Sequence, residues 1–182
     1  MIAQLTIPER RLALSILVAV ALCGLLLTVA GQGDPIGVHG LMFLAAGVAG
    51  IFVVIAGYLS PEPSAERLQS YYDEPTKFGI VMAMAWAVVG LFVGDWVAWL
   101  LVYPELTFDA GWASFGRIRP IHTTGVIFGF GGNALIATSF YVVQRTSRAR
   151  LPDQLSPWFV LLGYNLFCLI AVTGYMMGIT QS

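Results

Sequence analysis

The chain has 182 residues, of which 58% are hydrophobic and only 10% are charged, and its formal net charge is −1. Soluble domains carry about a quarter charged residues, so this composition excludes an ordinary water-soluble protein and indicates a membrane protein. The charge balance also argues against a nucleic-acid partner, which would require a basic surface.

Five apolar runs are long enough to cross a bilayer, which requires roughly 20 helical residues. In chain order they cover residues 12–30, 36–59, 78–102, 118–143 and 157–178. The sequence therefore predicts an all-α, multi-pass transmembrane helix bundle of five spans. A cleaved signal peptide is the alternative for the first run, which follows Arg10 and Arg11. That run exceeds the about 7–15 residues of a signal core, so a retained span is favoured.

The chain divides by polarity into a two-helix extension (1–60), a polar linker (61–77) and three further spans (78–182). Basic residues favour the cytoplasmic side of a membrane. With a cytoplasmic N-terminus, seven basic residues fall inside: Arg10, Arg11, Arg67, Lys77, Arg145, Arg148 and Arg150. Only Arg117 and Arg119 fall outside, at the start of the fourth span. A pair of cations there suggests a bound anion.

His39 and His122 are the two histidines of the sequence, and ionisable groups inside a membrane span are functional candidates. On a helix, Gly125, Gly129 and Gly132 lie at +3, +7 and +10 from His122, on its face. A histidine above a glycine groove offers a nitrogen ligand to haem iron and a flat surface for the porphyrin. Helix–helix packing is the alternative role of the glycines.

The arginines complete this hypothetical haem seat. Haem propionates need cations at the water boundary, and a guanidinium suits a carboxylate. Arg117 and Arg119 precede His122 by five and three residues. Histidine, groove and arginines together describe a haem site near the outer surface. An interfacial histidine without any ligand is the plainer interpretation.

The segment around His122 closely resembles a known family. Residues 115–135, FGRIRPIHTTGVIFGFGGNAL, are similar to the helix that carries a low-spin haem ligand in subunit I of cbb3-type cytochrome c oxidases. Residues 137–146, the lead-in YYDE (71–74) and the ending GITQS (178–182) also resemble that family. The resemblance extends over residues 71–182.

This resemblance implies a site and an activity. His122 would be an axial ligand of a low-spin haem b, Arg119 would hold a propionate with Arg117 nearby, and Gly125 and Gly129 would border the haem. The family passes electrons from cytochrome c through that haem to a high-spin haem b and copper, where dioxygen is reduced to water with proton translocation. It resides in the bacterial inner membrane with membrane-anchored c-type cytochrome subunits. The related nitric oxide reductases share the broader architecture.

The chain departs from the family in its histidines. The second axial ligand, the copper ligands and the high-spin haem ligand are further histidines, and none follows His122. The chain is therefore expected to be an N-terminal portion of the subunit, or one product of a split subunit. Residues 78–182 would be the first helices of the haem–copper core, no catalytic residue would lie in this segment, and the remaining C-terminal helices would be partners.

Other polar residues leave alternatives open. His39 and His122 could together ligate a haem in a small self-contained b-type cytochrome, although a hydrogen-bonded interfacial role is favoured for His39. An assembly subunit without haem is a third possibility. Asp95 could relay protons, but a place at the outer interface or an ion pair with an arginine is favoured. We expect Asn133 to bond a neighbouring helix.

Two simpler features complete the sequence reading. Trp96, Trp99, Tyr103 and Trp112 crowd the outer end of the third span, as expected of an interfacial aromatic belt. Cys23 and Cys168 both lie in apolar runs and are expected to be small buried hydrophobes.

Overall fold

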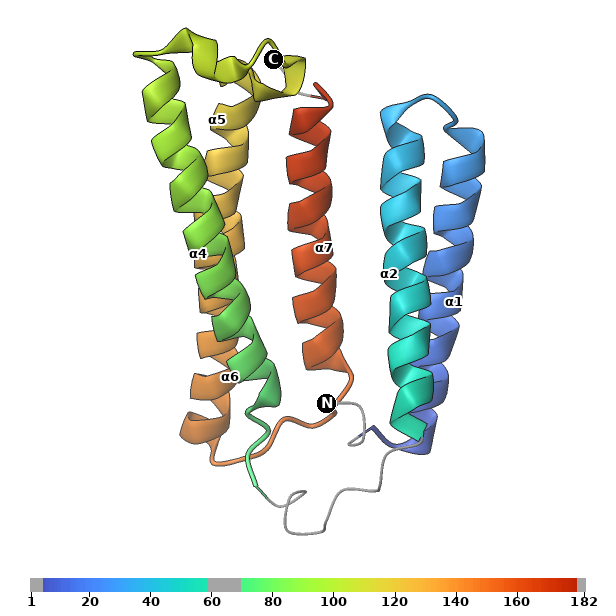
Figure 1. Ribbon diagram of the computed structural model, residues 1–182. Helices are drawn as coiled ribbons and strands as arrows, with labels where there is room; N and C mark the ends of the chain where they lie inside the picture. The colour runs from blue at the N-terminus through green and yellow to red at the C-terminus, as the bar shows by residue number, and fades with distance from the viewer. Residues whose placement is uncertain (1–4, 59–69, 180–182) are drawn as a thin grey trace. The chain divides into compact units, whose positions relative to one another are not determined.

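The computed structural model describes residues 5–58 and 70–179, and that part of the chain is helical without a β-strand. Five helical segments are long and apolar enough to cross a membrane: Ile7–Ala30, Pro35–Tyr58, Glu74–Leu100, Phe115–Ser147 and Ser156–Met176. They confirm the all-α, five-span prediction (Figure 1). Several helices begin earlier than predicted, because their first turns contain polar residues such as Glu9 and Glu74.

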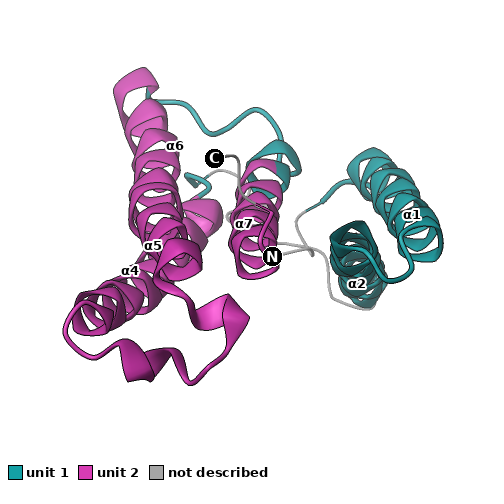
Figure 2. Cartoon of the chain, turned by 90° about the horizontal axis from the view of Figure 1, so that it is seen from above, with its two compact units in different colours: residues 1–72, 148–159 teal, residues 73–147, 160–182 magenta. Residues whose placement is uncertain are grey.

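The chain forms two compact units (Figure 2). Unit 1 comprises residues 1–72 and 148–159, and unit 2 comprises residues 73–147 and 160–182. Residues 59–69, which include the first part of the predicted linker (61–77), lie outside the described residues. Residues 74–77, which the polarity assigned to the linker, form the first turn of a helix instead.

Unit 1 is built on a hairpin of α1 (Ile7–Ala30) and α2 (Pro35–Tyr58). At the start of α1, Thr6 Oγ1 accepts from the Glu9 amide, while Glu9 Oε2 accepts from the Thr6 amide. Further along, Gly24 lies so close to α2 that a Cβ would be 2.7 Å from the Gly40 carbonyl oxygen. Such close backbone approach is a main source of helix association in lipid.

The two cysteines differ in environment. Cys168 is buried in α7, as predicted, but Cys23 is exposed. The prediction for Cys23 was wrong because an apolar run does not indicate which face of its helix meets a neighbour. In a membrane, an apolar residue is equally stable facing lipid.

Unit 2 contains α4 (Glu74–Leu100) and one long span made of three helical pieces: α5 (Phe115–Thr123), the π-helix η4 (Thr124–Gly132) and α6 (Asn133–Ser147). The 3₁₀ helices η2 (Pro104–Thr107) and η3 (Gly111–Ala113) connect α4 to α5 (Figure 1). Most of α7 (Ser156–Met176) completes the unit.

A buried polar cluster joins three helices of unit 2. Asn165 of α7 donates to Asn133 Oδ1 (2.8 Å) and to the Leu161 carbonyl (2.8 Å). Asn133 donates to Asn165 Oδ1 (3.2 Å) and to the Gly129 carbonyl (2.7 Å), and Trp86 Nε1 donates to Asn165 Oδ1 (2.8 Å). Every amide and indole N–H is used, so the cluster fixes the register of α4, α6 and α7 at little desolvation cost. The predicted helix-bonding role of Asn133 is confirmed.

An ion pair joins the other ends of α4 and α6. Arg145 donates to both carboxylate oxygens of Asp73, at 2.6 and 2.7 Å, and lies over the Tyr141 ring. These hydrogen bonds hold the pKa of Asp73 below its ordinary value. The stabilisation is therefore fully present above the ordinary carboxyl pKa of about 4 and is lost as the pH falls through the lowered one. Both side chains are about one-third exposed, so the pair contributes less than about 1 kcal/mol.

Candidate functional site

His122 lies in the last turn of α5, two residues after Pro120 and two residues before the π-helix begins at Thr124. Its Nδ1 is 2.8 Å from the carbonyl oxygen of Gly90 on α4. A carbonyl can only accept, so Nδ1 carries the proton and the lone pair of the neutral ring lies on Nε2. No hydrogen bond between Nε2 and another described residue is present. This is the tautomer of a histidine that ligates a metal through Nε2.

Three close contacts set α4 against the His122 span. A Cβ on Gly94 would lie 2.5 Å from His122 Nδ1, and closer still to Cε1. One turn back along α4, Gly90 lies against Gly125, whose Cβ would be 3.2 Å from the Gly90 Cα. Gly94 and Gly90, one turn apart on α4, therefore contact the helix face that carries His122 and Gly125.

Trp86 makes the third contact, one turn beyond Gly90. A Cβ on Gly129 would lie 2.5 Å from Trp86 Cδ2, so the indole ring lies directly on this glycine. Gly125 and Gly129 are both buried in this contact with α4. The glycine groove thus receives α4, and the packing alternative for these glycines accounts for what is seen.

Gly132 does not share this face. A Cβ there would meet the Tyr164 side chain of α7, whose hydroxyl donates to the Phe128 carbonyl at 3.0 Å. The prediction assumed a constant α-helical period from His122. The π-helix holds more residues per turn, so residues at its end are rotated away from that period.

The two arginines have different surroundings. Arg117 is half-buried, and its Nη1 donates to the Met176 carbonyl at the C-terminal end of α7 (3.1 Å). It also lies beside Gly178, which has a left-handed φ of 84°. Arg119 is exposed, and its guanidinium makes no hydrogen bond or ion pair with the described residues. Of the pair, Arg119 is the cation left available to an anion.

The segment between α4 and α5 packs over the end of the span that carries His122. Leu100, Ala113 and Ile118 form a buried cluster there. Trp96 Nε1 donates to the Leu106 carbonyl (3.3 Å), and the Trp96 and Trp112 rings meet edge to face at 6.0 Å. The aromatic residues therefore bind this connecting segment to α4.

Comparison with known proteins identifies the family. The sequence model described as "Cytochrome C and Quinol oxidase polypeptide I" matches residues 74–182, more than half of the chain. The chain belongs to this family. The match includes His122, its glycine neighbours and both arginines.

Individual relatives agree with this assignment. "Cytochrome c oxidase subunit 1 homolog" of Azorhizobium caulinodans is 49% identical over 148 residues, which cover 79% of this chain and 27% of the relative. "Cytochrome c oxidase subunit 1 homolog, bacteroid" of Bradyrhizobium diazoefficiens is 44% identical over 184 aligned positions, covering 98% of this chain and 33% of the relative. "Cbb3-type cytochrome c oxidase subunit CcoN1" of Stutzerimonas stutzeri is 44% identical over 102 residues, covering 56% of this chain and 22% of the relative.

The chain therefore spans between a fifth and a third of the length of these relatives. It is a multi-pass membrane protein of the oxidase family. Among its described residues, no group of three or more His, Cys, Asp or Glu side chains could hold a metal ion. A haem bound through a single histidine does not require such a group.

The other polar candidates of this oxidase-family chain are His39 and Asp95. His39 belongs to unit 1, and its Nε2 is buried without a hydrogen-bond partner among the described residues. His122 belongs to unit 2. Asp95 is exposed, and its carboxylate forms no ion pair or hydrogen bond with the described residues.

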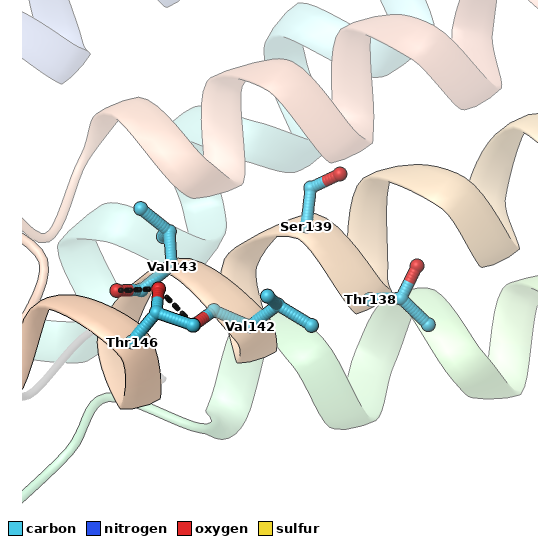
Figure 3. A pocket seen from close by; sticks show the side chains of 5 residues that line it. All are labelled: Thr138, Ser139, Val142, Val143 and Thr146. Carbon is cyan, nitrogen blue, oxygen red and sulfur yellow. Dashed lines mark hydrogen bonds between the residues drawn. The ribbon is translucent and has the colours of Figure 1, made fainter.

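A shallow groove on α6 is lined by Thr138, Ser139, Val142, Val143 and Thr146 (Figure 3). All five residues belong to one helix. The hydroxyls of Thr138, Ser139 and Thr146 donate to carbonyls of their own helix. This groove offers no converging side chains that could hold a haem.

The sequence interpretation missed the α4 side of the site, namely Trp86, Gly90 and Gly94. A signal was present, because Gly90 and Gly94 have the G-x-x-x-G spacing at which transmembrane helices approach closely. The spacing does not say which helix approaches. The contact with His122 is therefore known only from the fold.

Proposed function

We propose that this chain is the N-terminal part of subunit I of a cbb3-type cytochrome c oxidase and supplies one axial ligand, His122, to a low-spin haem b. The observation that supports this most directly is the His122 Nδ1 to Gly90 carbonyl bond of 2.8 Å, which leaves Nε2 as the free donor atom. The similarity to a cbb3-type relative supports the oxidase type.

In this proposal, the residues of unit 2 hold and orient the ligand. The Gly90 carbonyl accepts a hydrogen bond from Nδ1–H, which fixes the tautomer and raises the basicity of Nε2. The bound haem would supply one-electron transfer, and the complete enzyme would add a high-spin haem b and copper for dioxygen reduction. Electrons would come from cytochrome c through membrane-anchored c-type subunits, in the bacterial inner membrane. The remaining C-terminal helices would provide the second axial ligand.

Arg119 is the proposed propionate partner. It is exposed, uncommitted among the described residues, and three residues from His122 on the same helix. Arg117 lies on the same helix, and its proposed part is to add positive charge while it holds the end of α7. Contact of Gly125 and Gly129 with the haem remains a prediction, with α4 lying against both.

The proposed function predicts that the chain does not reduce dioxygen by itself. Its two histidines could complete the ligands of one haem, which leaves neither an open iron site nor ligands for copper. We expect no sustained oxygen uptake from reduced cytochrome c when membranes contain this chain alone. Uptake should appear when the remaining helices and c-type subunits are co-expressed. Oxygen-electrode turnover by the chain alone, with stoichiometric copper, would contradict the proposal.

Replacing Arg119 by alanine should lower the reduction potential of the low-spin haem. A nearby cation disfavours the more positive ferric state, so its removal favours oxidation, whereas Arg119→Lys should produce a smaller change. A redox titration of the complete oxidase measures both. Arg148→Ala, a basic residue outside the site, is the matched control. An unaltered potential in Arg119→Ala would favour binding of lipid headgroups by this arginine.

A further inference from the structure

We propose that Gly94 and Gly90 of α4 are positioning residues for His122, and that together they set the place, plane and tautomer of its imidazole. This inference rests on the proposed function, in which His122 is a haem ligand. In this inference the two glycines tune the haem indirectly. They act on the His122 ring and do not contact the iron.

Gly94 provides the space for the ring. A Cβ at this position would lie 2.5 Å from Nδ1, closer to Cε1, and 3.2 Å from Nε2. Real Cβ atoms essentially never lie so close to a neighbouring atom, so any side chain at position 94 must displace the imidazole or separate the helices. A glycine inside a helix costs about 1 kcal/mol relative to alanine. The ring contact gives a physical reason for glycine here.

Gly90 provides the acceptor. A Cβ on Gly90 would lie 3.0 Å from Val126 Cγ2 and 3.1 Å from the backbone of Gly125. The absence of a side chain therefore lets the α4 backbone approach the π-helix closely. This approach brings the Gly90 carbonyl within 2.8 Å of His122 Nδ1.

The two glycines act on the same ring from adjacent turns of α4. Gly94 fixes where the ring can lie, and Gly90 fixes which nitrogen carries the proton. A hydrogen bond from Nδ1–H to a carbonyl makes the ligand more basic, which favours ferric iron. Weakening that bond should therefore raise the haem potential and change the orientation of the imidazole plane.

The test compares Gly94→Ala, Gly116→Ala and His122→Ala in the complete oxidase. The paramagnetic resonance g-values of the ferric low-spin haem report the imidazole plane, and a redox titration reports the potential. We expect Gly94→Ala to shift the g-values, raise the potential and slow electron entry roughly tenfold. Gly116, where an added Cβ meets no atom within 4 Å, should tolerate alanine without change.

The outcomes separate the two levels of the proposal. If His122→Ala removes the low-spin haem but Gly94→Ala leaves its g-values and potential unaltered, the positioning role is refuted and the ligand stands. If His122→Ala leaves the low-spin haem intact, the ligand assignment fails, and the positioning role fails with it.

If the Gly94→Ala protein does not accumulate in the membrane, a double variant tests the positioning role instead. Removing the imidazole opens the space that the new methyl group requires, so Gly94→Ala/His122→Ala should accumulate to the level of His122→Ala. That rescue would support the contact between residue 94 and the ring. Loss of the double variant beside a stable His122→Ala would show that the methyl group clashes elsewhere, and would overturn the inference.

Discussion

His122→Ala should abolish the low-spin haem signal of the complete oxidase and stop electron entry from cytochrome c. The reason is coordination, because alanine offers no donor atom to the haem iron. His122→Met should retain a haem with an altered potential, since axial ligand identity is a main determinant of haem potential. Reduced-minus-oxidised spectra and cytochrome c oxidation rates provide the measurement.

His39→Ala is the matched control, because it removes the other histidine of the sequence. It should leave the low-spin haem band in place. Loss of the band in both variants would instead support a b-type cytochrome that uses both histidines. An unchanged spectrum in His122→Ala would remove the basis for the haem assignment and would favour an assembly role without haem.

Gly129→Ala should destabilise the protein by about 1–3 kcal/mol, the usual cost of adding a methyl group to a packed core. The new Cβ would lie 2.5–2.7 Å from three atoms of the Trp86 indole. That ring is buried and held by its 2.8 Å hydrogen bond to Asn165. Relief of the clash would move the ring and leave polar groups of the buried cluster unsatisfied.

Gly131→Ala is a control two residues away in the same π-helix. Its added Cβ would meet only the Val126 carbonyl, at an ordinary 3.7 Å. Alanine should therefore be neutral or slightly stabilising at position 131. Thermal unfolding of both variants in one detergent gives the comparison. Equal unfolding midpoints for the two variants would mean that the packing of Trp86 does not require a glycine at position 129.

The number and type of the spans could be predicted from the sequence, because apolar length is the dominant signal in a membrane chain. Which face of each helix meets a neighbour could not be predicted. Lipid-facing and buried positions are both apolar, so Cys23 and Cys168 have similar sequence surroundings and opposite exposures. Polar residues are the exception, and Asn133 was correctly expected to bond another helix.

The site was predicted on one helix only. His122, Gly125 and Gly129 were recognised because they share a helical face, and the arginines because they fall on the predicted outer side of the membrane. Their distances from α4 depend on tertiary packing, which a single sequence does not encode locally. From the sequence, Arg117 and Arg119 were interpreted as a pair. In the structure, the Arg117 side chain binds the end of α7, whereas the Arg119 guanidinium has no partner among the described residues.

The π-helix between Thr124 and Gly132 has a consequence for the angular phase of its span. Each of its turns holds more residues than an α-turn, so the segment acts like a built-in offset between the halves before and after it. His122, before the offset, contacts α4, whereas Gly132 and Asn133, at its end, contact α7. One continuous span can thus turn His122 toward one neighbour while a second neighbour fixes its rotation.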